Sequence, residues 1–207
     1  MLLLQSCSDS EAKSSSDNLP FFVSQDLTPV WIDKDSDEYG NIHKIANFSF
    51  IDQDSNTVTN KTFAGKIYIA DFFFTSCLGL CTNMSAVLQQ LQKYFKEDNN
   101  VLILSHSVTP KIDTVPVLKK YADRKHAIDG KWFMVTGERS KIYEIARKSY
   151  FADENYNSDQ DINTFFHSEN FYLVDQLRRI RGVYNGTLPA DMDRLKEDIK
   201  ILEKNNI

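Results

Sequence analysis

The stretch KIYIADFFF, residues 66–74, carries the strongest indication of the fold. It is a nearly continuous run of apolar, β-branched and aromatic residues, and it is shorter than a typical helix. Short runs of this kind are typical of strands that are covered on both faces of a sheet. The segment therefore predicts a buried strand inside the sheet of the protein.

Strand and helix patterns alternate after this run. Four later segments have the apolar spacing of helices, and two others are short apolar runs. Two further segments, one before this run and one near the end of the chain, are apolar stretches interrupted by polar residues that favour turns, a pattern that predicts β-hairpins. The predicted elements are a β-hairpin over 43–60, strands over 66–74, 101–110 and 132–137, helices over 83–97, 114–125 and 140–150, a second hairpin over 170–186 and a last helix over 190–206.

This order predicts an α/β fold with a central mixed β-sheet flanked by helices. Strands that alternate with helices form parallel pairs joined by right-handed crossovers. A closing antiparallel hairpin and helix after such a unit is the thioredoxin-like order, here with the hairpin at 43–60 as an N-terminal extension. We expect a thioredoxin-like domain over 43–207, an extended arm over 19–42 and a flexible tether within 1–18.

Composition excludes two classes of function. The chain has 207 residues, a net charge of −5 and 42% hydrophobic content, which suits one domain with an unstructured flank. An acidic balance of this kind offers no basic surface for a nucleic acid backbone. No stretch approaches the roughly 20 apolar residues of a membrane helix, so we expect no membrane span and no nucleic acid partner.

The N-terminal segment MLLLQSCSDSEAKSSSDN contains Cys7. An apolar stub, a small residue, a cysteine and a polar Ser-rich tract look like the truncated end of a bacterial lipoprotein signal, with Cys7 as the acylated residue. That hypothesis places the protein in the bacterial cell envelope, lipid-anchored on the outer face of the cytoplasmic membrane or in the periplasm. The alternative is a disordered N-terminus with an incidental cysteine.

The other two cysteines lie in TSCLGLCTN, residues 75–83, between the first buried strand and the first predicted helix. The carboxyl end of a strand in an α/β sheet is where chemistry usually occurs, and a helix start favours the thiolate form of a cysteine. Cys77 and Cys81 are close enough for a disulfide or for one metal ion. A purely structural disulfide would close too short a loop to stabilise much, and inert thiols would not need this position. The pair therefore predicts redox or metal chemistry.

Copper is the metal that this ligand set favours. Zinc in structural sites takes four ligands, whereas two thiolates and one imidazole suit copper. His167 stands just before the predicted strand FYLVD and is the best third ligand, since that loop lies beside the active-site helix in a thioredoxin-like order. We expect His43 and His126 at the surface and His106 in the core.

Three segments in order resemble the Sco/SenC family of copper-binding, thioredoxin-like proteins: DFFFTSCLGLCTNM at 71–84, SHSVTPKIDTVPVLKKYA at 105–122 and FHSENFYLVDQLRRIRGVYNG at 166–186. The resemblance covers roughly residues 40–203. It implies that Cys77, Cys81 and His167 bind one copper ion. It also implies that the protein delivers copper to, or reduces the cysteines of, the dinuclear copper site of cytochrome c oxidase.

The chain departs from the family pattern at three positions. Leu78 and Thr82 replace the two prolines of the cysteine motif, which leaves their amide N–H groups able to donate. Thr109 replaces an aspartate of the second motif, and we do not expect it to touch the site. Without the prolines, the balance between copper carriage and thiol exchange stays open.

Three hypotheses follow. The first is a copper metallochaperone, not an enzyme in the turnover sense, whose partner is the copper-site subunit of the oxidase or another copper acceptor. The second is a thiol–disulfide oxidoreductase of the cell envelope that uses Cys77 and Cys81 and is recycled by an envelope thiol reductant. The third is a peroxide-scavenging relative, for which Thr75 is near the thiols but the sequence indicates no arginine. The copper oxidation state, Cu(I) or Cu(II), stays undecided.

Overall fold

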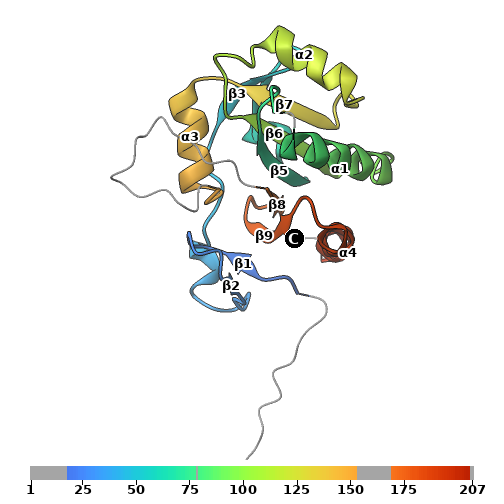
Figure 1. Ribbon diagram of the computed structural model, residues 1–207. Coiled ribbons are helices and arrows are strands. Elements are labelled where there is room, and N and C mark those ends of the chain that lie inside the picture. The colour runs from blue at the N-terminus through green and yellow to red at the C-terminus, as the bar shows by residue number, and fades with distance from the viewer. Residues whose placement is uncertain (1–17, 78, 153–168, 206–207) are drawn as a thin grey trace, which may run out of the picture.

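The computed structural model describes residues 18–77, 79–152 and 169–205 (Figure 1). Cys7, His167 and the tether predicted within 1–18, except its last residue, lie outside these ranges. The elements are β1 (Phe21–Phe22), β2 (Pro29–Val30), η1 (Tyr39–Asn41), β3 (Ser49–Asp52), β4 (Thr57–Thr59), η2 (Asn60–Phe63), β5 (Ile67–Phe73), α1 (Leu80–Tyr94), β6 (Val101–Ser107), α2 (Val115–Arg124), β7 (Trp132–Thr136), α3 (Arg139–Lys148), β8 (Asn170–Val174), β9 (Ile180–Asn185) and α4 (Pro189–Lys204).

Seven strands form one mixed sheet in the order β4-β3-β7-β6-β5-β8-β9. The predicted buried strand is β5, and all seven of its residues are buried. It pairs in parallel with β6 and antiparallel with β8, while β3 with β4 and β8 with β9 form the two antiparallel hairpins. The thioredoxin-like prediction, with its N-terminal hairpin, is therefore confirmed.

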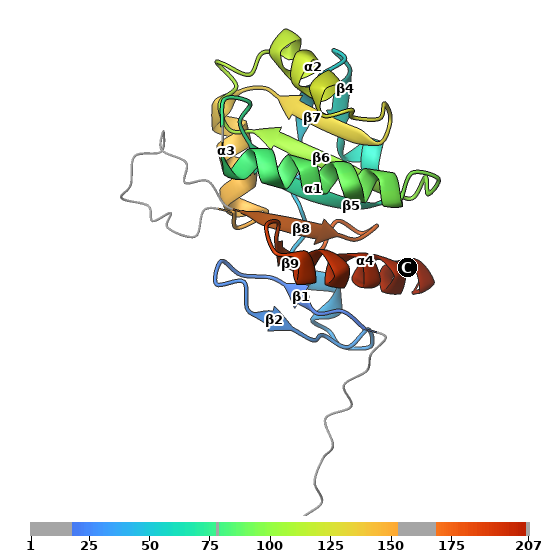
Figure 2. The ribbon, with the colours of Figure 1, turned by 45° about the vertical axis from the view of Figure 1, so that its right-hand side comes forward.

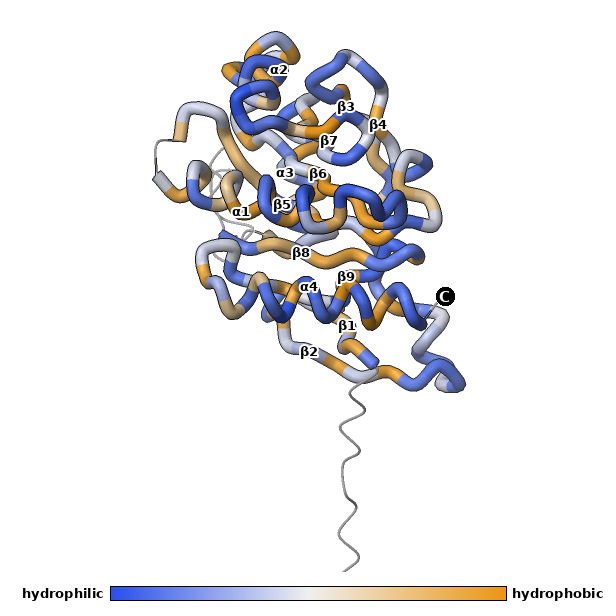
Figure 3. Tube along the Cα trace, turned by 90° about the vertical axis from the view of Figure 1, so that its right-hand side faces the viewer, coloured by the Kyte–Doolittle hydropathy of each residue, from blue (hydrophilic) through white to orange (hydrophobic). Residues whose placement is uncertain are grey.

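Helices cover both faces of the sheet (Figures 1 and 2). One apolar cluster joins α1, α2 and α4 to one face. A second cluster joins α3 to the other face and includes side chains of β3 and β4, which are part of the sheet. Figure 3 shows β8 as a mainly apolar strand and α4 as alternating apolar and polar turns, as expected for a covered strand and an amphipathic helix. No helix in the described part of the chain is long and apolar enough to cross a bilayer.

The arm predicted as extended contains a small antiparallel sheet of β1 and β2. It packs beside the edge strand β9, where Arg181 Nε donates to the Pro20 carbonyl at 2.9 Å. The guanidinium of Arg181 also lies 4.0 Å from the centre of the Phe21 ring. Strands of two residues have no measurable periodicity, so the sequence pattern could not indicate them.

Candidate functional site

The thiol pair lies where β5 gives way to α1. Cys77 is in the loop after β5, and Cys81 is in the first turn of α1. Both residues are present as thiols rather than as a disulfide. The structure therefore places the pair just after the carboxyl end of a central strand, as the sequence predicted, next to the end of the parallel strand β6.

Cys77 lies at the N-terminus of α1. Gly79, which precedes the helix, provides no side-chain cap, and the Cys81 N–H donates to Cys77 Sγ at 3.4 Å. Burial by itself would raise the pKa of the Cys77 thiol, but backbone N–H groups of Cys81, Gly79 and Leu80 outweigh it and lower that pKa. Cys77 is therefore the thiol that ionises first.

Cys81 has the opposite environment. Its exposed fraction is 1%, and it packs in the core cluster beneath α1. Burial raises the pKa of Cys81 to about 12 against a hydrogen bond from the Phe74 backbone, and the neighbouring Cys77 and Asp71 add to the rise. The pair thus consists of a reactive outer sulfur and a protonated inner one.

Asp71 is a buried carboxyl group on β5 that sequence reasoning did not assign. Ser105 on β6 donates a short hydrogen bond to it, and Trp132 Nε1 donates to the same Ser105 hydroxyl at 2.8 Å. Burial raises the pKa of Asp71 to about 7, against the effect of the Ser105 hydrogen bond. An acidic residue within an otherwise apolar buried run was the signal that could have identified it.

Asp113 is the second acidic residue that sequence reasoning missed. It follows β6, has an exposed fraction of 0%, and accepts hydrogen bonds from Thr75, Ser107 and Thr109. Thr109 was expected to stay away from the site, but it is linked to the cysteine loop through this carboxylate. Asp113 lies in the second family-like segment, but the sequence pattern did not indicate its contact with Thr75, 38 positions earlier.

The described histidines lie away from a shared ligand position. His106 is buried on β6 against Phe72, with ring centroids 4.9 Å apart, and burial lowers the pKa of His106 to about 3. His126 is exposed, whereas His43 is half-buried and its Nε2 lies 2.9 Å from the Ser149 carbonyl oxygen. The core prediction for His106 and the surface prediction for His126 are confirmed, while His43 is less exposed than expected.

His167 lies outside the described residues. Among the residues that are described, no three His, Cys, Asp or Glu side chains are grouped so that they could hold a metal ion. Strand β8 runs antiparallel to β5, so its first residue, Asn170, lies toward the sheet end where β5 finishes. The two thiols are soft donors that suit copper, so the donor set that is described fits this metal.

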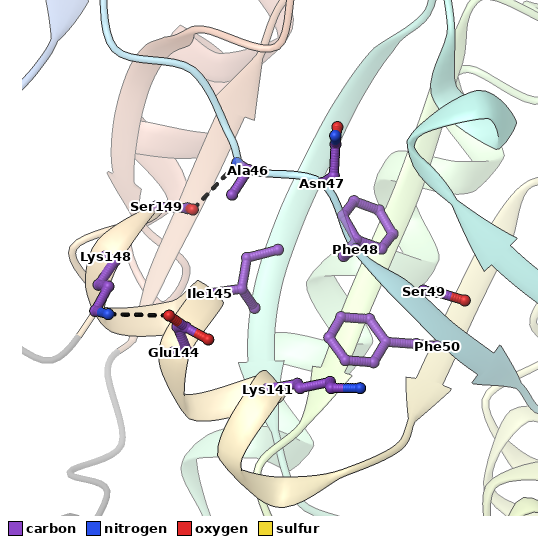
Figure 4. A pocket seen from close by; sticks show the side chains of 10 residues that line it. All are labelled: Ala46, Asn47, Phe48, Ser49, Phe50, Lys141, Glu144, Ile145, Lys148 and Ser149. Carbon is purple, nitrogen blue, oxygen red and sulfur yellow. Dashed lines mark hydrogen bonds and ion pairs between the residues drawn. The ribbon is translucent and has the colours of Figure 1, made fainter.

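A hollow of about 500 Å³ lies away from the thiol pair, between the segment entering β3 and helix α3 (Figure 4). Phe48, Phe50 and Ile145 form its apolar wall. Its charged residues include Glu144 and Lys148, which form an ion pair at 2.9 Å. None of the described residues that line the hollow is a cysteine or a histidine, so we do not assign the chemistry to it.

The fold and the thiol pair define a thioredoxin-like protein with a Cys-x-x-x-Cys site at the end of a central strand. Residues 36–202 match the SCO1/SenC family. A SCO1 protein homolog of Bacillus subtilis is 33% identical over 160 residues, which cover 76% of this chain and 82% of the relative. The chain therefore belongs to the SCO1/SenC family.

Solved structures agree with this assignment. A SCO1/SenC family lipoprotein from Bacillus anthracis has a TM-score of 0.68 at 27% identity, covering 78% of this chain and 95% of that one. BsSco is described as a member of the Sco family of cytochrome c oxidase assembly proteins that has a disulfide switch. Its structure has a TM-score of 0.64 at 31% identity, and the match covers 77% of this chain and 93% of BsSco. Copper-bound ScoI of Arabidopsis thaliana has a TM-score of 0.60 at 26% identity, and the match covers 77% of this chain and 98% of ScoI.

Proposed function

We propose that this protein binds one copper ion through Cys77, Cys81 and His167 and passes it to the copper-site subunit of cytochrome c oxidase or to another copper acceptor. The observation that carries the proposal is the unequal thiol pair at the helix start. Cys77 is the thiol that ionises first, because its pKa is lowered by the N–H groups near it, and Cys81 supplies a second sulfur from the buried side. Two thiolates favour Cu(I), and an added imidazole also accepts Cu(II).

Relatives support the copper part of this proposal. Copper is bound in the ScoI structure of Arabidopsis thaliana, and BsSco is described as a member of a family of cytochrome c oxidase assembly proteins. Copper is cargo in this function, so its transfer requires that each protein ligand be replaced by a ligand of the acceptor. A partly exposed Cys77 suits that exchange, because an incoming ligand can reach the metal from the solvent side.

Copper titration of the reduced protein tests the ligand set. We expect one copper ion per chain in the wild type, about a tenfold or greater loss of affinity and an altered absorption spectrum in His167→Ala, and no stable copper binding in Cys77→Ser. His126→Ala, which removes an exposed histidine elsewhere, is the matched control and should behave as the wild type. An unchanged spectrum and affinity in His167→Ala would exclude the three-ligand site.

The same unequal thiols favour a second function, thiol–disulfide exchange. The Cys77 thiolate would attack a substrate disulfide, forming a mixed disulfide and releasing the other substrate sulfur as a thiolate. Cys81 would then attack Cys77 Sγ, which gives the reduced substrate and a Cys77–Cys81 disulfide, and an envelope thiol reductant would return the two electrons. Disulfide reductase activity in metal-free protein, unaffected by His167→Ala, would favour this function over copper transfer.

We also propose an envelope location, with the protein anchored through a lipid on Cys7 and a tether that leads to the arm. A relative from Bacillus anthracis is described as a lipoprotein. The described chain begins at Asn18, next to the arm that packs on β9. Incorporation of a labelled fatty acid into the wild type, but not into Cys7→Ser, is the expected result in cells, and equal labelling of both would exclude this anchor.

A further inference from the structure

The segment that carries the thiols joins β5 to α1. No proline occurs in residues 75–83, so no ring fixes the backbone φ angles of this segment. Side-chain hydrogen bonds contact the described part of this segment at two places. At one end, the Thr82 hydroxyl donates to the Cys77 carbonyl at 3.2 Å. At the other end, Thr75 donates hydrogen bonds to the Asp113 carboxylate.

Asp113 binds the start of this loop at two atoms. The Thr75 hydroxyl donates to Oδ1 at 2.5 Å, and the Thr75 N–H donates to Oδ2 at 3.2 Å. Thr75 is two residues before Cys77, and the Cys77 N–H in turn donates to the Phe74 carbonyl at 3.3 Å. The carboxylate therefore determines where the chain leaves β5 and turns toward Cys77.

Asp113 is itself fixed from the side of β6. The Ser107 hydroxyl donates to Oδ2 at 2.6 Å and the Thr109 hydroxyl at 2.9 Å. No Lys, Arg or His pairs with this carboxylate among the ion pairs of the described residues. A buried carboxylate without a cation needs such donors to offset its desolvation. The arrangement thus joins the ends of two neighbouring strands at one buried charge.

We propose that Asp113 is a positioning residue for the thiol pair: it holds Thr75 so that Cys77 Sγ stays against the N–H groups at the start of α1. Asp113 does not touch the reacting sulfur and acts through Thr75. The inference rests on the proposed use of Cys77 and Cys81 as ligating or reacting thiols. Its test uses metal-free protein, so that a failure of copper binding and a failure of this inference give different results.

The test compares the alkylation rate of Cys77 by iodoacetamide at pH 7 in reduced, full-length variants that also carry Cys7→Ser. Asp113→Asn keeps the size of the side chain but offers one acceptor oxygen instead of two, so the Thr75 N–H and hydroxyl must compete with the Ser107 and Thr109 hydroxyls for it. We expect a fall in rate of about tenfold, because the thiolate is the reacting form and a displaced Cys77 Sγ loses the N–H donors that stabilise it. The midpoint reduction potential of the Cys77–Cys81 pair should shift as well.

Variants of Thr75 distinguish positioning from a general loss of stability. Thr75→Val, which removes the hydroxyl at constant shape, should lower the rate as Asp113→Asn does. Thr75→Ser, which keeps the hydroxyl, should stay near the wild type. The double variant Thr75→Val/Asp113→Asn should be no slower than the slower single variant, because both changes break the same linkage.

Ser107→Ala is the matched control. It removes a donor to the same carboxylate on the β6 side, so it should lower thermal stability and leave the alkylation rate within about twofold of the wild type. An unchanged rate and potential in folded Asp113→Asn would overturn the inference, and so would an equal fall in rate in Ser107→Ala. If Asp113→Asn does not fold, the alkylation rates of Thr75→Val and Thr75→Ser test the inference instead, and equal rates in these two variants would overturn it.

Discussion

At the scale of single residues, the two thiols of the Cys-x-x-x-Cys motif differ because they face different surroundings. Cys77 Sγ accepts from the N–H groups that open α1, which lowers the pKa of its thiol, whereas burial raises the pKa of Cys81 to about 12. Helix starts favour negative charge and apolar cores disfavour it. The two thiols of the motif therefore differ in how readily they ionise. Cys77 forms a nucleophilic thiolate more easily than Cys81 does, which suits both stepwise metal release and disulfide exchange.

This difference predicts unequal alkylation in single-cysteine proteins. In a Cys7→Ser background, Cys81→Ser leaves Cys77, and its reaction rate should rise and level off at a lower pH than that of the glutathione thiol, because a lowered pKa gives thiolate earlier as pH increases. Cys77→Ser leaves Cys81, which should react slowly until the pH is strongly alkaline. Rates measured with iodoacetamide across pH check this, and matching profiles for the two variants would contradict it.

At the scale of elements, two buried arginines join the N-terminal arm to the sheet, and Arg181 is the one that donates hydrogen bonds to the arm backbone. Arg181 on β9 donates to the carbonyls of Leu19 and Pro20, and it lies 3.3 Å from Asp175, whose exposed fraction is 0%. Arg179 forms a second ion pair with the same carboxylate at 2.8 Å. The arm covers strand β9, whose backbone would otherwise be an exposed sheet edge.

Removing Arg181 should release the arm and destabilise the domain. Arg181→Met should cost about 3 kcal/mol, because it leaves buried carbonyls without donors and weakens the neutralisation of Asp175. Amide hydrogen exchange over residues 19–22 should become faster. The matched control, Arg194→Met, alters an exposed arginine near β9 and should cost about 0.5 kcal/mol or less in urea unfolding. Equal losses in both variants, with unchanged exchange, would refute this function of Arg181.

At the scale of the whole molecule, two buried groups on neighbouring strands make opposite contributions to the dependence of stability on pH. Burial raises the pKa of Asp71 to about 7 from its ordinary value of 3.8, and it lowers the pKa of His106 to about 3 from 6.5. Between pH 4 and 6, the folded protein therefore holds a proton on Asp71, whereas the unfolded chain holds one on His106. The proton counts match, so the two contributions to the pH slope cancel in this window.

Replacing one of the two groups should reveal the pH dependence of stability that the other group causes. In Asp71→Asn the depressed pKa of His106 remains, so the unfolded chain binds more protons and stability should rise from pH 4 to 6 by roughly 2 kcal/mol. In His106→Leu the raised pKa of Asp71 remains, the folded protein binds more protons, and stability should fall over the same range by a similar amount. Urea unfolding at several pH values measures both, and slopes of the same sign would contradict the assignment.

The sequence by itself determined the order of the elements and the place of the thiols. Apolar runs such as 66–74 and helical spacing such as that of 83–97 are local patterns, and each follows from which faces of a strand or helix are covered. The three ordered motifs also indicated the SCO1/SenC family, which the match over residues 36–202 shows. Helix α1 begins at Leu80 rather than at residue 83, so its boundary was less accurately predicted than its existence.

The tertiary structure decided what local patterns do not contain. The contrast between Cys77 and Cys81 depends on burial, and burial is known once the helices have packed on the sheet. The Asp113–Thr75 contact joins residues 38 positions apart, and the Arg181–Pro20 contact joins residues 161 apart. A propensity or period is a property of neighbours along the chain, whereas the pKa of a thiol and the position of a loop depend on groups that folding brings together.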